Sequence, residues 1–103
     1  MHTIEATLLS PGNYILQGDL VFNNINKASI KLVNFTQSAT TISIDLQRLG
    51  KIDSAGLALL IEWVKNSHLH NKKLRFNNIP AQLMALAKLS YLPEIDLFNE
   101  QNN

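Results

Sequence analysis

Cysteine is absent from the 103 residues, which excludes disulfide bonds, thiol catalysis and cysteine-ligated metal sites. The sequence also has no glycine-rich phosphate-binding loop, because its four glycines are scattered singly along the chain. The longest apolar run, Leu57 to Ile61, is far shorter than the ~20 residues that a membrane-spanning helix needs. We therefore expect a protein with no cofactor, no small-molecule substrate and no direct insertion into a membrane.

Charge of either sign is sparse. Nine Lys or Arg residues against eight Asp or Glu residues leave a net charge of +1, and the basic residues are dispersed along the chain. Such a sequence lacks the basic surface that binding to nucleic acid phosphates requires. The first residues, Met1 to Thr7, have neither the basic head nor the apolar run of a signal peptide, so we expect a cytoplasmic protein.

The length and the 46% hydrophobic content fit one globular domain covering residues 1–103. Alternating apolar residues predict strands, and apolar residues three or four apart predict helices. The predicted strands are 3–9, 14–18, 41–46, 73–77 and, at an edge, 95–98; the predicted helices are 24–34, 54–68 and 80–89. Strand–helix–strand units favour parallel neighbours, so we expect an α/β fold: a mixed four- to five-stranded sheet with about three helices on one face. Residues 99–103 are expected to form a frayed tail.

The stretch 41–65 combines an alternating strand, a predicted basic loop at Arg48–Lys51 and an apolar helix. On a helical wheel the predicted core stripe consists of Leu57, Leu60, Ile61 and Val64. Leu59 and Trp63 fall at roughly 200° and 240° from Leu57, on the opposite side of the helix. Either a neighbouring segment covers these two residues, or they form an exposed apolar patch in which Trp63 anchors a partner.

Three residues stand out where this helix begins. Asp53 or Ser54 can cap the free backbone N–H groups of the first turn. Gly56 is unfavourable in a helix by ~1 kcal/mol relative to alanine, which indicates that something packs closely against the backbone there. A phosphate on Ser54 would lie at the positive end of the helix and would add charge to a nearby apolar interface.

The segment Asp53-Ser54-Ala55-Gly56-Leu57, which follows an Ile-Asp-Leu strand, resembles the signature of the STAS domain. The segment Gly18-Asp19-Leu20 and a late helix extend the resemblance over nearly the whole chain. The resemblance implies a mixed sheet with helices on one side. It also implies one of two roles: an anti-sigma-factor antagonist phosphorylated at the serine matching Ser54, or the MlaB-like accessory subunit of the Mla phospholipid-transport ABC complex.

The late motif, Leu86-Ala87-Lys88-Leu89 followed by a Leu-Pro pair, is most similar to that of the accessory subunit. The resemblance then implies a non-enzymatic protein that binds the ABC transporter ATPase and, through it, associates peripherally with the inner membrane. Many STAS domains carry an aspartate where this chain has Val21, and that difference makes regulation by phosphorylation of Ser54 less secure. The residues expected to bind the partner are Lys51, Ile52, Asp53, Ser54, Ala55, Gly56, Leu57, Leu59 and Trp63.

Other chemistry has little support in the sequence. His68 and His70 lie near the end of the long helix, but they point in different directions and no third ligand follows at a suitable spacing. No segment resembles the nucleophile elbow of a serine hydrolase. A small hydrolase or ligand-binding enzyme is therefore the least supported of the three functional hypotheses, and we expect no metal and no catalytic residue.

Overall fold

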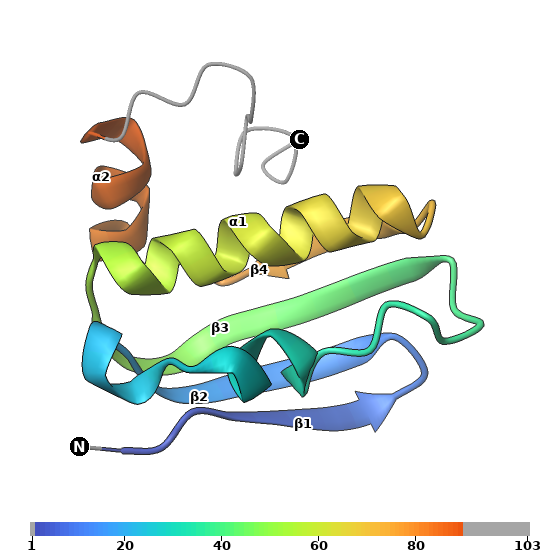
Figure 1. The fold of residues 1–103 in the computed structure, drawn as a ribbon, viewed down its shortest axis with the longest axis horizontal. Helices are drawn as coiled ribbons and strands as arrows, with labels where there is room; N and C mark the ends of the chain where they lie inside the picture. The colour runs from blue at the N-terminus through green and yellow to red at the C-terminus, as the bar shows by residue number, and fades with distance from the viewer. Residues whose placement is uncertain (1, 90–103) are drawn as a thin grey trace.

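A computed structural model of the chain describes residues 2–89 (Figure 1). Its elements, in chain order, are β1 (Glu5–Ser10), β2 (Asn13–Leu20), the 3-10 helices η1 (Phe22–Asn24) and η2 (Lys27–Leu32), β3 (Thr41–Ile52), α1 (Ser54–Leu69), β4 (Lys73–Asn77) and α2 (Ala81–Leu89). The strand predicted at 95–98 and the tail at 99–103 lie outside the described residues. No helix within the described part of the chain is long and apolar enough to cross a membrane.

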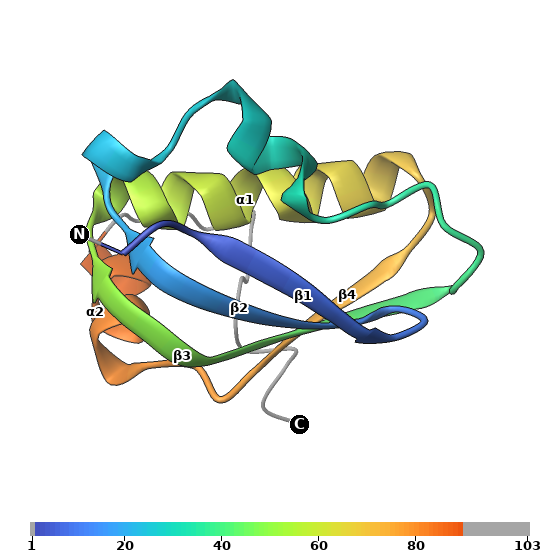
Figure 2. The same cartoon turned by 90° about the horizontal axis from the view of Figure 1, so that it is seen from below.

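The described strands form one sheet in the order β1-β2-β3-β4. β1 and β2 are antiparallel, whereas β2 with β3 and β3 with β4 are parallel pairs. The helix α1 and the two 3-10 helices lie over the same face of the sheet, and α2 stands beside the start of α1 (Figures 1 and 2). The α/β fold with a mixed sheet, predicted from the order of the elements, is confirmed.

The core lies between the sheet and α1. Every second residue in the first half of β3 points into it, and Ile42, Ile44 and Leu46 are completely buried. Leu57 and Leu60 of α1 pack against this surface from above. Each fully buried aliphatic side chain contributes about 1.5–3 kcal/mol relative to an exposed one, so these residues fix α1 on the sheet.

The outer side of α1 decides between the two alternatives that the sequence leaves open, and a neighbouring segment covers it. Leu59 is 3% exposed and Trp63 is 0% exposed, so the interpretation of these two residues as an exposed patch is wrong. The segment containing η2 covers this side of the helix, and the Trp63 Nε1–H donates a hydrogen bond to the Ile30 carbonyl over 3.0 Å. Ile61 and Val64, by contrast, are only partly buried. The helix therefore buries a wider surface than a single stripe.

The segment predicted as the helix 24–34 forms η1 and η2 instead. Asn26 caps the longer piece, η2: its side chain accepts a hydrogen bond from the Ala28 N–H, while the Asn26 N–H donates to the Ser29 hydroxyl. Apolar residues three apart fit a 3-10 helix as well as an α-helix. Asparagine side chains also bond to nearby backbone groups, which favours short turns over a continuous helix.

The predicted basic loop Arg48–Lys51 belongs to β3, which is longer than expected. Arg48 lies opposite Gln17 and Leu49 opposite Gly18, because β2 pairs with β3 along nearly its whole length. The register shifts twice along this pair, which breaks the strict alternation that identifies a strand in the sequence. The strand at 73–77 and the two α-helices agree with the prediction to within one or two residues.

The burial of Trp63 leads to a testable prediction. We expect Trp63→Ala to destabilise the fold by about 3–5 kcal/mol, because it leaves a cavity under η2. Trp63→Phe removes the hydrogen bond to Ile30 and should cost about 1–3 kcal/mol. Urea unfolding followed by circular dichroism measures both changes. Leu69→Ala, at an exposed position of the same helix, is the control and should stay within about 0.5 kcal/mol of the unmodified protein.

Candidate functional site

The start of α1 is held by one carboxylate. The Asp53 Oδ1 accepts hydrogen bonds from the backbone N–H groups of Ala55 and Gly56, over 2.9 and 3.3 Å. Its Oδ2 accepts from the Phe22 N–H over 3.0 Å. Asp53 is therefore the helix cap, and it also positions the 3-10 segment beside the first turn of α1. Ser54, the first residue of the helix, is exposed.

Gly56 lies where α1 comes closest to the sheet. A Cβ atom at this position would collide with the Leu20 carbonyl oxygen and would lie 2.7 Å from the Leu20 Cβ. The prediction that something packs closely against Gly56 is therefore confirmed, but the neighbour is β2 of the same chain. The Asp53 N–H donates to the same Leu20 carbonyl over 3.0 Å, which ties the end of β3 to the end of β2.

An apolar groove of about 350 Å³ runs between α1 and the 3-10 segment. Ala55, Ala58 and Glu62 contribute from α1, and Ala58 and Glu62 lie one and two turns after Ser54 on the same side of the helix. Phe22, whose side chain is 74% exposed, stands at the edge of this groove. The complete lining is Phe22, Ile25, Asn26, Lys27, Ile30, Ala55, Ala58, Leu59 and Glu62.

The structure divides the residues predicted to bind a partner into two groups. Lys51 and Ser54 are exposed, and Asp53 and Ala55 are half-buried, so a partner can reach these four. The other five are buried within this chain, and only Leu59 among them reaches the groove, so the remaining four are not exposed for direct contact. These buried positions are Ile52, Gly56, Leu57, Leu59 and Trp63, of which Leu59 still forms part of the groove floor.

The sequence-based prediction missed seven of the nine groove residues: Phe22, Ile25, Asn26, Lys27, Ile30, Ala58 and Glu62. Assigning 24–34 to a single helix gave no role to Ile30, which is 37% exposed in the structure. Phe22 was assigned to no element at all. One signal was available, since an isolated phenylalanine between Val21 and two asparagines has no place in an alternating or helical pattern. Ala58 follows Ser54 by four residues and shares its helix face.

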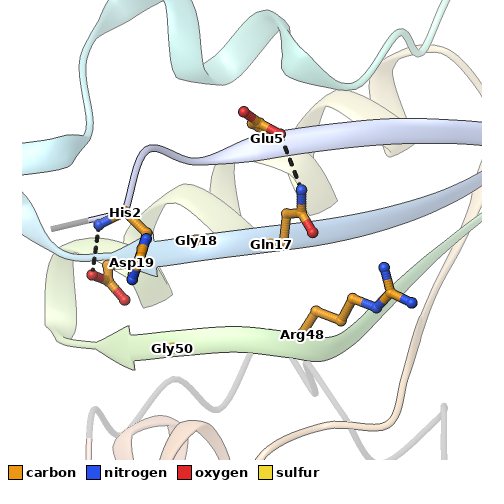
Figure 3. Close-up of a pocket in the computed structure, with 7 residues that line it drawn as sticks. All are labelled: His2, Glu5, Gln17, Gly18, Asp19, Arg48 and Gly50. Carbon is orange, nitrogen blue, oxygen red and sulfur yellow. Dashed lines mark hydrogen bonds between the residues drawn. The ribbon is translucent and has the colours of Figure 1, made fainter.

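A second hollow, of about 400 Å³, opens over β1, β2 and β3 and is bordered by His2, Gln17 and Arg48 (Figure 3). Its buried carboxylate belongs to Asp19, whose Oδ2 accepts from the His2 N–H over 3.1 Å and whose Oδ1 accepts from the Lys51 N–H over 2.9 Å. Both oxygens thus bind backbone groups, and the Arg48 side chain points away from Asp19 in Figure 3. The Asp19 carboxylate therefore joins the N-terminal segment to the end of β3.

These hydrogen bonds set the electrostatics of Asp19. The N–H groups of His2 and Lys51 stabilise the ionised form and lower the pKa of the Asp19 carboxyl from its usual value of 3.8. Burial acts in the opposite direction but is the smaller effect. Gly50 makes this contact possible, because a Cβ there would collide with the Asp19 Oδ1. Within residues 2–89, no group of three His, Asp or Glu side chains is placed to hold a metal ion.

The fold is similar to that of a solved regulatory protein. The structure of the anti-sigma factor antagonist SpoIIAA in its unphosphorylated form superposes with a TM-score of 0.62. The match covers 84% of this chain and 83% of that chain, at 15% sequence identity. At this identity the similarity concerns the α/β fold alone.

A family model described as "Mlab, STAS domain" matches residues 15–97, which is most of the chain. The chain therefore belongs to the MlaB-type family of STAS-domain proteins. The matched region contains the junction of β2, β3 and α1 and the whole apolar groove. The resemblance read from Asp53 to Leu57 in the sequence is confirmed at the level of the family.

The lowered pKa of Asp19 predicts how stability depends on pH. Because the folded-state pKa lies below the unfolded value of 3.8, the stabilisation by Asp19 is complete above that value and is lost as the pH falls through the folded-state pKa. We expect Asp19→Asn to be less stable than the unmodified protein at about pH 6, and this difference to shrink towards about pH 2.5. Urea unfolding of both proteins over this range measures it. A constant difference at every pH would contradict the assignment.

Proposed function

We propose that the protein is a non-enzymatic subunit that binds the ATPase of a phospholipid-transporting ABC system. The partner docks on a surface formed by Ser54 and the apolar groove, called here the docking surface. Membership of the MlaB-type family supports the choice of partner. The observation that carries the proposed surface is the apolar groove itself, which opens beside Ser54.

The composition of the groove fits a protein partner. Phe22 is a large aromatic side chain that is mostly exposed, and such residues are frequent anchors at protein interfaces. Ala55 and Ala58 are small, so a partner segment can approach α1 closely at this point. Lys27 and Glu62 lie at the rim and offer one charge of each sign. Rim charges of this kind set orientation more than affinity, while the apolar centre supplies the binding free energy.

Ser54 lies at a point of the docking surface where a group added to its side chain would disturb the contact with the partner. It precedes Ala58 by one helical turn on the same face and is exposed, while the neighbouring Asp53 caps the first turn of the helix. A bulky or charged group at this position would protrude at the end of the groove without disturbing the core. Binding through this surface would also place the protein at the cytoplasmic side of the inner membrane, held there by its partner.

Co-purification with the ATPase subunit tests the docking surface. We expect Ser54→Glu and Ala58→Arg each to reduce the recovered complex at least about tenfold, because a charge enters an apolar contact, equivalent to about 1.4 kcal/mol or more. Ser38→Glu is the matched control, since Ser38 is exposed in the loop that leads into the other end of β3. All three variants should keep the circular dichroism spectrum of the unmodified protein.

An undiminished complex in both Ser54→Glu and Ala58→Arg would exclude this surface. Loss of the complex in Ser38→Glu as well would show that the effect is not specific to the groove. Recovery of a different partner, with no ABC ATPase present, would instead refute the transport role while leaving the surface in place.

A second candidate function is supported by the similarity to SpoIIAA: an anti-sigma-factor antagonist that is switched by phosphorylation of Ser54. The exposure of Ser54 at the helix start makes it accessible to a kinase. This hypothesis predicts phosphate on Ser54 in protein isolated from its native cells, and loss of an anti-sigma partner on phosphorylation. Intact-mass measurement and peptide mapping test it, with Ser54→Ala as the control. Unmodified Ser54 under all growth conditions, together with a stable ABC complex, would decide against it.

A further inference from the structure

The first strand, β1, is an edge of the sheet with one free side. It pairs with β2 only, and among the described residues no backbone hydrogen bond joins Glu5–Ser10 to any segment other than β2. A free edge presents a row of unpaired N–H and C=O groups to any chain that aligns with it. This edge also carries two exposed leucines, Leu8 at 53% and Leu9 at 60% exposure.

Most of the features that protect edge strands are absent from β1. Natural edges are protected by lysine, by proline within the strand, by inward-pointing charges or by a bulge. β1 contains no lysine and no proline, and its single charged residue, Glu5, is engaged with the Gln17 amide over 3.0 Å on the neighbouring strand. The bulge at Leu9 lies near the end of the strand, where the register shifts between Leu8 and Ser10. The stretch Glu5–Leu8 remains regular and open.

The strand is also complementary to itself. Ala6 and Leu8 lie opposite Leu16 and Tyr14, on the core side of the sheet, whereas Glu5 and Thr7 lie on the other side. Two copies of β1 placed antiparallel about Thr7 align Ala6 of one chain with Leu8 of the other, so that the exposed Leu8 gains an apolar neighbour. Thr7 then faces Thr7, a favourable cross-strand pair.

Other antiparallel pairings of two β1 strands also leave the core sides of the two sheets on the same face, but they fit less well. Centring on Glu5 would bring two carboxylates together, which is unfavourable. Centring on Leu8 would place the bulge at Leu9 inside the paired region. Centring on Ala6 requires Ile4, which precedes the strand. With Thr7 at the centre, all five paired positions belong to β1, the three inner ones from Ala6 to Leu8 are regular, and the bulge at Leu9 lies only at the end of the paired region.

We propose that β1 is a homodimerisation edge: two copies pair antiparallel about Thr7, which joins the two sheets into one. The docking surface does not include any residue of β1, so this inference is independent of the proposed function. Each chain of the dimer keeps its own groove. The dimer has a small interface, because only about five residues of each chain pair, and it therefore forms at high protein concentration and dissociates on dilution.

The absence of cysteine makes a disulfide test possible without background. Thr7→Cys places identical thiols directly opposite each other, at the Cα separation of about 4.5–5.5 Å found for cross-strand pairs, which a disulfide spans. Glu5→Cys is the matched control on the same face, because its two copies would be four residues apart along the strand, about 13 Å. With a copper–phenanthroline oxidant, we expect about tenfold more covalent dimer from Thr7→Cys than from Glu5→Cys.

A second variant tests the role of the apolar contact. Adding Leu8→Lys to Thr7→Cys puts a charge beside Ala6 of the other chain and should reduce the cross-linked fraction about tenfold. Leu8 is exposed, so circular dichroism should show an unchanged fold. Light scattering of the unmodified protein should show the mass rising towards that of a dimer with concentration. Equal cross-linking of the two cysteine variants, or a monomeric mass at all concentrations with no Thr7→Cys dimer, would overturn the proposal.

Discussion

The contact between the first turn of α1 and the end of β2 is the constraint on which the rest of the structure depends. Leu20 packs against Gly56, and its carbonyl accepts the Asp53 N–H, so the helix begins at one fixed place above the sheet. Asp53 then holds the helix start and Phe22 with a single carboxylate. Because the chain continues from Leu20 directly into η1, the position of the groove beside Ser54 follows from this one junction.

The sequence predicts elements well where the pattern has one meaning. The strand at Lys73–Asn77 and the helix beginning at Ser54 were identified because alternation or helical spacing continues without interruption and the ends are marked by caps. Prediction from the sequence fails where one pattern of residues fits two different structures. The spacing around Ile30 suits either helix type, and the register shifts in β3 make the residues near Arg48 look like a loop.

The burial of Trp63 shows what a helical wheel cannot predict. A helical wheel assumes that one face meets the core and the other meets solvent, yet here the segment containing η2 folds back over the second face. That segment is tied down by contacts between residues distant in the sequence, such as the Tyr14 hydroxyl, which accepts from the Asn34 N–H over 3.1 Å. No local pattern predicts such a contact. The contact residues predicted from the sequence therefore include Ser54 and Ala55 but none of the groove residues from the 3-10 segment.

The same geometry bears on how a phosphate at Ser54 would act. Asp53 already occupies the N–H groups of Ala55 and Gly56, so a phosphate would find these donors taken and a carboxylate close by. Little helix stabilisation is then available to it, even at the positive end of the helix dipole. Its main effect would be to place about two negative charges at the mouth of an apolar groove, beside Ala58. Modification of Ser54 would thus regulate what binds in the groove and leave the fold of the domain unchanged.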